Sequence, residues 1–161
     1  MPSESPPRPI VSAEVPEITS TLYPPPHDRV VAGRGKRRLG LAAGLTQFGV
    51  NLTRLAPGAA TALLHWHSHE EEAVYMLAGE AVLESGTERH VMKAGDFVGF
   101  PAGGPHGHRI VNESNAEALL LEIGSRVDGD TATYPGLPLR AEKIDGGYRF
   151  TVEDQNRGRL S

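Results

Sequence analysis

At residues 65–72 the sequence reads His65-Trp66-His67-Ser68-His69-Glu70-Glu71-Glu72. Six of the seven histidines lie between residues 65 and 108, so this run belongs to a histidine-rich segment. Residues two positions apart in a β-strand point to the same face, so His65 and His67 can present two imidazoles to one ion. A short turn after them lets a carboxylate approach the same ion. The stretch therefore predicts a metal site with nitrogen and oxygen ligands.

The choice of metal is limited by the residue types that the chain contains. There is no cysteine, which excludes thiolate ligands, disulfides and a cysteine nucleophile. Imidazole and carboxylate together suit one divalent transition metal, such as Zn²⁺, Mn²⁺, Fe²⁺, Co²⁺, Ni²⁺ or Cu²⁺. The ligands do not choose among these ions, and a fourth ligand has to come from a distant strand.

The sequence around this site has the pattern of an all-β fold. From Phe48 onward, apolar side chains alternate with polar or small ones, as in a half-buried strand. Further short runs are separated by turn residues, and they span residues 61–67, 73–83, 88–92, 97–100, 106–111 and 118–123. No segment gives a convincing helix signal. Many short strands with regular turns predict a sandwich or barrel, of which the jelly roll is one form.

Two segments resemble the two sequence motifs of the cupin superfamily. The first has Pro57-Gly58 followed by His65, His67, Glu72 and Gly79, and the second has Gly95-Asp96, Pro101-Ala102-Gly103 and His106. The resemblance covers about residues 45–124 and implies a small single-domain cupin with a jelly-roll β-barrel. It also implies that one divalent metal is held in the barrel interior by His65, His67, Glu72 and His106.

The match departs from the cupin pattern at two points. Six residues separate Gly58 from His65, one more than is usual, which predicts a variation in a turn. The Asn that the pattern places after the last His is replaced by Ile110, and Asn112 follows two positions later. The second departure removes a side chain that often supports the site, but neither changes a ligand.

His108 shares strand parity with His106, so we expect it to point into the barrel as well. It is a candidate general base or substrate-binding group. The alternative is a histidine that only supports the ligands or fills the core. His69 is expected in a loop or at the rim, and Glu71 is expected to face solvent.

The chain divides into three predicted segments. Residues 1–38 are rich in proline and predict an extended, partly disordered arm. Residues 39–125 predict the cupin β-barrel core, and residues 126–161 predict a polar C-terminal segment that packs on the barrel or on a partner subunit. The basic run at residues 34–38 is either a phosphate-binding patch or a solvated edge, and the solvated edge is favoured.

Composition limits the classes of partner. The length of 161 residues and the apolar share of 39% predict one globular domain with a core. A net charge of −4 gives no reason to expect nucleic acid or an anionic membrane surface as partner. No apolar run reaches the roughly 18 residues of a membrane span. These features predict a cytoplasmic protein.

Three histidines and one glutamate leave open positions on a metal that prefers five or six ligands. The sequence therefore predicts a metal-dependent enzyme that acts on a small oxygen-bearing metabolite by dioxygenase, isomerase or lyase chemistry. The alternative is a non-catalytic cupin whose metal organises a small-ligand site. The resemblance to cupins further implies a homodimer, since related proteins often exchange edge strands or arms.

Overall fold

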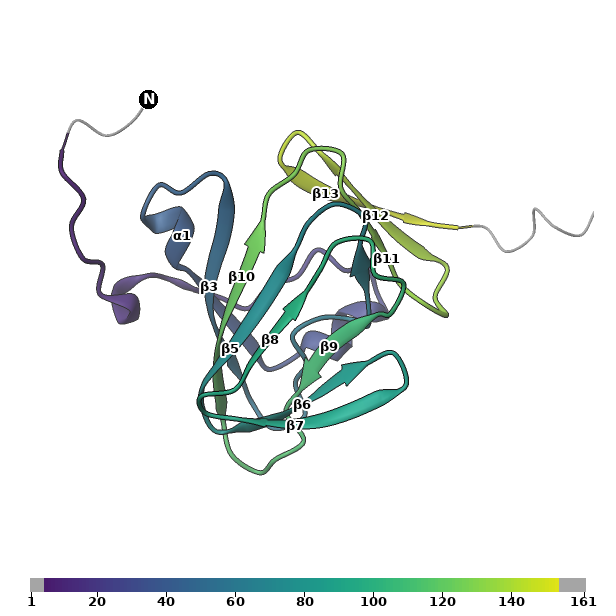
Figure 1. The fold of residues 1–161 in the computed structure, drawn as a ribbon, viewed down its shortest axis with the longest axis horizontal. Coiled ribbons are helices and arrows are strands. Elements are labelled where there is room, and N and C mark those ends of the chain that lie inside the picture. Colours follow the sequence, from purple (N-terminus) through teal and green to yellow (C-terminus); the bar gives the residue numbers. More distant parts are fainter. Residues whose placement is uncertain (1–4, 154–161) are drawn as a thin grey trace, which may run out of the picture.

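The computed structural model describes residues 5–153, and nearly all of its regular structure is β (Figure 1). The strands form three sheets, and every pairing between them is antiparallel in this part of the chain. The first sheet has six strands, in the order β1 (Glu17–Ile18), β2 (Arg34–Arg38), β3 (Phe48–Leu55), β10 (Ala118–Ser125), β5 (Glu72–Ala78) and β8 (Phe97–Phe100).

Two smaller sheets complete the fold. The three-stranded sheet has the order β7 (Glu88–Lys93), β6 (Glu80–Ser85) and β9 (His108–Val111). The four-stranded sheet has the order β13 (Gly147–Val152), β12 (Leu139–Ile144), β11 (Thr131–Thr133) and β4 (Trp66–His67). The helical elements are short, namely η1 (Ser12–Glu14), η2 (His27–Val31) and α1 (Leu39–Ala42). None of the helices within residues 5–153 has the length and hydropathy needed to cross a bilayer.

The main core lies between the six-stranded and three-stranded sheets. Alternate residues of β3, β5 and β10 meet alternate residues of β6 and β9, as the period of two in a strand requires. Leu55, Met76 and Leu120 are fully buried there, together with Ile110. Burying these side chains supplies the principal driving force that holds the two sheets together.

The predicted all-β fold is confirmed, with one qualification about closure. The three sheets are not joined by continuous strand pairing into one barrel within the described residues. Isolated bridges connect their edges instead, Ala60 with Val111 and His65 with His108. The second bridge lies in the candidate site.

One predicted run, residues 73–83, is divided into two strands at Gly79. This glycine has a φ of 73°, in the left-handed region that favours glycine. A Cβ at this position would lie 2.6 Å from the carbonyl oxygen of Glu117. The turn therefore needs glycine, and it passes the chain from β5 in the first sheet to β6 in the three-stranded sheet.

The C-terminal residues form more regular structure than their composition suggested. β12 and β13 make a hairpin, and β11 joins them to β4, where His67 pairs with Ala132. A second apolar cluster, centred on Leu63, Tyr134 and Leu139, packs under this sheet together with Tyr23. The C-terminal segment thus packs on its own chain, directly beside the histidine run.

The basic run at residues 34–38 is not a solvated edge. It forms β2, which pairs with β3 inside the first sheet, and Arg34 is buried. Alternation along the strand turns Arg34, Lys36 and Arg38 toward an internal cavity, whereas Arg37 bonds to main-chain oxygens of Ala13 and Val15.

Candidate metal centre

The histidines approach each other because two loops meet at the edge bridge between His65 and His108. The main chains of these two residues exchange both hydrogen bonds, at 3.3 and 2.8 Å. His67 follows two positions later in β4 and faces the same side. Glu72, the first residue of β5, completes the group from the opposite strand.

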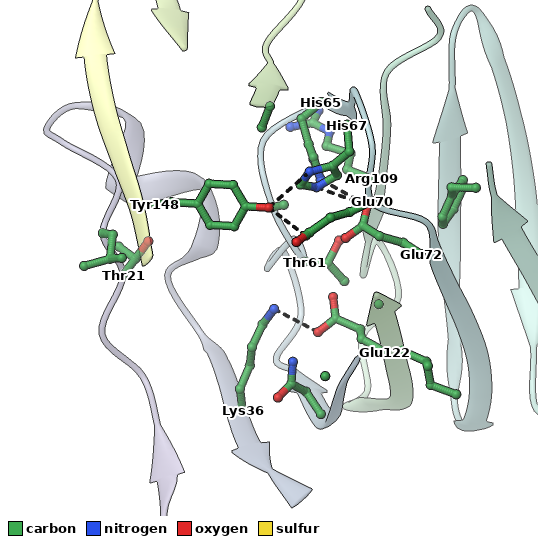
Figure 2. Close-up of a pocket in the computed structure, with 18 of the residues that line it drawn as sticks. Thr21, Lys36, Thr61, His65, His67, Glu70, Glu72, Arg109, Glu122 and Tyr148 are labelled. Atoms are coloured by element: carbon green, nitrogen blue, oxygen red, sulfur yellow. Dashed lines mark hydrogen bonds and ion pairs between the residues drawn. The ribbon is translucent and has the colours of Figure 1, made fainter. Parts of the chain in front are cut away.

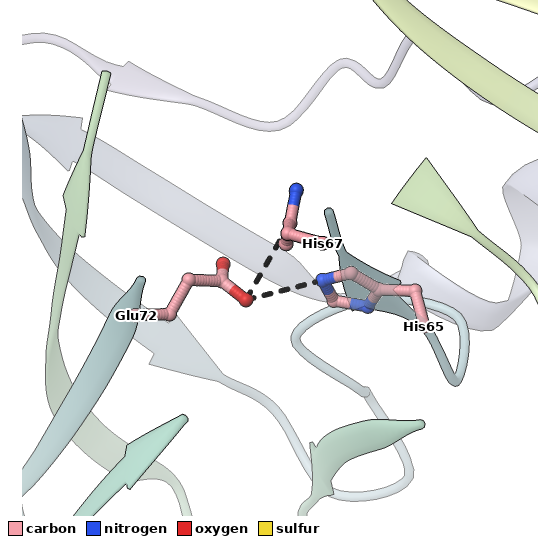
Figure 3. A group of neighbouring side chains, drawn as sticks. All are labelled: His65, His67 and Glu72. Atoms are coloured by element: carbon pink, nitrogen blue, oxygen red, sulfur yellow. Dashed lines mark ion pairs between the residues drawn. The ribbon is translucent and has the colours of Figure 1, made fainter. Parts of the chain in front are cut away.

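The imidazoles of His65, His67 and His108 converge on one carboxylate oxygen of Glu72. Figure 3 shows His65 and His67 directed at Glu72, with their Nε2 atoms 3.4 and 3.5 Å from its Oε2. The Nε2 of His108 lies 2.7 Å from the same oxygen. One donor atom from each of His65, His67 and Glu72 lies within 4.8 Å of the others, a spacing that can hold a metal ion.

The hydrogen bonds of Nδ1 in His65 and His67 determine that Nε2 of each ring faces the cluster. The Nδ1 of His65 donates to the carbonyl oxygen of Leu63 at 2.7 Å, and the Nδ1 of His67 donates to Oδ2 of Asp130 at 2.6 Å. A neutral imidazole that donates from Nδ1 carries a lone pair on Nε2. In these neutral tautomers two Nε2 lone pairs would face the Glu72 carboxylate, an arrangement that a metal ion between them would stabilise. Without a metal, a proton on an imidazole supplies the positive charge instead. The donor set fits a divalent metal.

Burial and the short distances between the imidazoles and the carboxylate shift the pKa values of Glu72, His65 and His108. Burial alone would raise the pKa of Glu72, but hydrogen bonds from His108 and His65 outweigh it and hold this pKa well below its usual range. Burial opposes a charge on His65, yet the Glu72 carboxylate raises the pKa of that imidazole. Burial lowers the pKa of His108. Glu72 is thus ionised, as a metal ligand has to be.

A buried polar network from the C-terminal segment holds His67 in place. Asp130 has no exposed surface, and its Oδ1 accepts hydrogen bonds from the main-chain N–H groups of His69 and Glu70. Its Oδ2 accepts from His67 and from the hydroxyl of Tyr148 at 2.8 Å. Partners of this kind fix the tautomer and direction of a metal-binding imidazole.

Glu70 is buried and belongs to the same network. Its Oε2 lies 2.7 Å from the hydroxyl of Tyr148, whose single proton it shares with Asp130, while its Oε1 accepts from the main-chain N–H of Val127 and from Lys143. A second group with ligand-like spacing, His67, Glu70 and Asp130, arises from this network. Its oxygens are already occupied by donors, so its role is support.

The structure does not bring His106 into the cluster. This residue is exposed in the bend before β9, and its ring lies against Gly86. His108, the candidate base in the sequence analysis, takes the place beside Glu72 and stacks on Phe100 with ring centroids 3.6 Å apart. His69 and Glu71 are exposed, as expected.

A cavity of about 800 Å³ opens from the cluster into the interior between the sheets. His65, His67 and Glu72 lie on its wall (Figure 2). His108 also lines it. Apart from the imidazoles, the wall carries six cationic side chains from the described part of the chain: Arg34, Lys36, Arg38, Arg109, Arg126 and Lys143. The space suits a small metabolite.

The sequence analysis missed Asp130 and Tyr148, because their role depends on a contact between distant segments. For the histidine that lies beside Glu72, a local signal existed. Asn112 follows His108 at the spacing that the cupin pattern sets between its last His and its Asn. In the structure Asn112 is fully buried and its amide donates to the carbonyl oxygens of Leu55 and Ala116. The second motif therefore has two extra residues before its histidine.

Comparison with known families agrees with this fold. The family described as "Cupin domain" matches residues 51–124. A crystal structure described as a sugar phosphate isomerase from a cupin superfamily, from Silicibacter pomeroyi, is 36% identical, with a TM-score of 0.87. The match covers 92% of this chain and 94% of that chain. The chain belongs to the cupin superfamily.

Two further solved structures are similar. One, from Acidithiobacillus ferrooxidans, is provisionally described as a sugar phosphate isomerase and is 34% identical. The match covers 74% of this chain and 76% of that chain, with a TM-score of 0.68. A predicted oxalate decarboxylase from Thermotoga maritima, 24% identical, shares the fold over 73% of this chain and 98% of its own, with a TM-score of 0.60. A search of curated proteins found no match.

Proposed function

We propose that the protein is a metal-dependent isomerase of sugar phosphates, with His65, His67, Glu72 and His108 as its metal ligands. The observation that carries the proposal is the convergence of three imidazoles on the Glu72 carboxylate, at the wall of a metabolite-sized cavity. In this assignment His108 replaces His106 as the fourth ligand. It also gives His108 a role other than that of a general base.

The choice of isomerase chemistry is supported by the relatives. Two of the similar structures, at 36% and 34% identity, are described as sugar phosphate isomerases, the second provisionally, and the Silicibacter pomeroyi protein matches over nearly the whole of both chains. Interconversion of an aldose and a ketose moves a proton between neighbouring carbons. A divalent metal at this site would polarise the carbonyl oxygen and so make the adjacent C–H more acidic.

The choice of an anionic substrate is supported by the cationic wall of the cavity. Arg34 is buried, and within residues 5–153 no carboxylate lies within ion-pair distance of it. Its Nη1 donates to the carbonyl oxygen of Thr61, while its Nε is buried without a partner in the described chain. A buried guanidinium without an ion-pair partner is costly. A phosphate group in the cavity would supply that charge, and Arg is well suited to bind it.

The experiment is a nuclear magnetic resonance assay of the purified protein with monophosphates of glucose, mannose, ribose and arabinose. Each reaction contains one added divalent metal, Zn²⁺, Mn²⁺, Fe²⁺, Co²⁺ or Ni²⁺. We expect conversion of at least one aldose phosphate to its ketose, and loss of conversion with a chelator. Failure of every sugar and metal pair would overturn the proposal.

A further inference from the structure

The cavity contains one carboxylate that neither the metal cluster nor the supporting network uses. Three carboxylates line it among the described residues: Glu70, Glu72 and Glu122. Glu72 is the centre of the histidine cluster. Both oxygens of Glu70 accept hydrogen bonds from neighbours. Glu122 is the remaining one.

Glu122 is held by one oxygen only. Lys36 lies 2.9 Å from its Oε2, and the hydroxyl of Thr53 donates to the same atom. In the described part of the chain, no hydrogen bond or ion pair involves Oε1. Figure 2 shows this second oxygen on the side of the carboxylate that faces Glu72. Glu122 therefore has a fixed position and an open acceptor toward the candidate metal centre.

The backbone explains how this carboxylate reaches the site. Glu122 lies in the middle of β10, where it pairs with Asn51 of β3 and with Val74 of β5. Val74 and Glu72 are two positions apart in β5, so they share a face, and Gly124 of β10 pairs with Glu72. Glu122 of β10 and Glu72 of β5 thus lie on the inner face of two neighbouring strands, offset by two residues along the strand direction.

The other titratable groups of the cavity are poorly suited to accept a proton. Burial raises the pKa of Tyr23, Tyr134 and Tyr148, so all three hydroxyls keep their protons at neutral pH. The lysine and arginine side chains are cationic, and the histidines belong to the metal cluster.

We propose that Glu122 is the group that transfers the proton in the isomerisation, and that Lys36 is its positioning residue. This inference rests on the proposed function. The Oε1 atom of Glu122 takes the proton from the carbon beside the aldehyde, and the C–H electron pair becomes the second bond of an enediolate. The Glu122 carboxylic acid then returns the proton to the former aldehyde carbon. The hydroxyl proton of the neighbouring carbon passes to the former carbonyl oxygen, so atoms and charge balance without an oxidant or reductant.

The test compares Glu122→Gln with the wild-type holoenzyme in D₂O, using the aldose phosphate that the wild type converts. The measurements are bound metal, the substrate KM, and exchange of the transferred hydrogen with deuterium. We expect unchanged metal content and a KM within a few-fold of wild type. Turnover and exchange should both fall by about 100- to 10,000-fold, the usual contribution of a positioned base. The matched control is Glu142→Gln, which removes an exposed carboxylate on β12 and should leave all three values unchanged.

The outcomes separate the two claims. A wild type that neither converts nor exchanges any aldose phosphate overturns the proposed function and the Glu122 assignment with it. A wild type that converts substrate, together with a Glu122→Gln variant of undiminished exchange, overturns the Glu122 assignment alone. Loss of metal from Glu122→Gln also overturns the assignment, because the carboxylate would then support the centre.

Lys36 is tested by two substitutions that differ in charge. Lys36→Met should lower the turnover rate with little change in metal content, since Glu122 loses the partner that fixes its Oε2. Lys36→Arg keeps a cation within reach and should recover much of the rate. Equal rates in both variants would overturn a positioning role, because a packing role does not depend on the charge.

Discussion

The imidazole of His67 donates from Nδ1 to Oδ2 of Asp130 across 2.6 Å, although 63 positions separate the two residues in the chain. This contact joins the histidine run to the C-terminal sheet, and it leaves Nε2 of His67 facing Glu72. The C-terminal segment therefore does more than cover a barrel. It sets the direction of a proposed metal ligand.

Asp130→Asn should weaken metal binding by about 10- to 100-fold, the usual effect of losing a partner that orients a ligand. The amide of the variant would place a donor or a weaker acceptor against Nδ1 of His67. A competition titration with a coloured chelator measures the change. Asp145→Asn is the control, because Asp145 is exposed in the β12–β13 turn and its left-handed backbone tolerates Asn. Equal affinities in all three proteins would contradict this account.

His108→Ala should lose bound metal, whereas His106→Ala should keep it. The reason is position: His108 contacts Glu72 at 2.7 Å, and His106 is exposed beside Gly86. Elemental analysis of both variants, purified in parallel, decides between them. Loss of metal in His106→Ala with retention in His108→Ala would restore the ligand set of the sequence analysis.

The sequence was sufficient for the strands of the cupin core and for three residues of the site. Period-two alternation and turn residues located β3, β7, β8 and β10 closely. Spacing within one strand and one turn brought His65, His67 and Glu72 together, because such short-range relations follow from backbone geometry. The proposed fourth ligand depends on the length of a loop, and two extra residues before β9 would place His108 and not His106 beside Glu72. The homodimer stays a prediction.

The C-terminal sheet was missed although a hairpin signal is present. Asp145-Gly146 has positive φ at both residues, at 52° and 79°, as a tight two-residue hairpin turn requires. Leu139 and Ala141 before it are buried on one face of β12. Asp130 gave no such signal, since a single aspartate becomes informative only when the fold places His67 against it.

Gly79→Ala should destabilise the protein more than Gly95→Ala does. Both glycines have positive φ, so each substitution costs about 1–3 kcal/mol of backbone strain. Only at Gly79 would the new Cβ meet a backbone oxygen, that of Glu117 at 2.6 Å, whereas nothing lies within 4 Å at Gly95. Chemical denaturation of the two variants gives the difference. Equal losses of unfolding free energy in the two variants would show that the contact with the Glu117 carbonyl at the β5–β6 turn has no measurable effect.

The ion pair between Glu17 and Arg54 should make the free energy of unfolding depend on pH. A hydrogen bond from Arg54 holds the pKa of Glu17 below its ordinary value of 4.5. The folded-state pKa is therefore lower than the unfolded one, so this contribution is present above pH 4.5 and is lost as the pH falls through the lowered value. Because the pair is partly exposed, it is worth less than about 1 kcal/mol. Denaturation of Glu17→Gln and wild type at several pH values should give curves that converge in acid. A constant difference would contradict the assignment.

The most direct measurement is the metal content of the wild-type protein purified without added metal or chelator. The account predicts close to one divalent transition metal ion per chain, with His65→Ala, His67→Ala and His108→Ala all depleted. It is contradicted by a wild type that binds no divalent metal, either as purified or after dialysis against Zn²⁺, Mn²⁺, Fe²⁺, Co²⁺ or Ni²⁺.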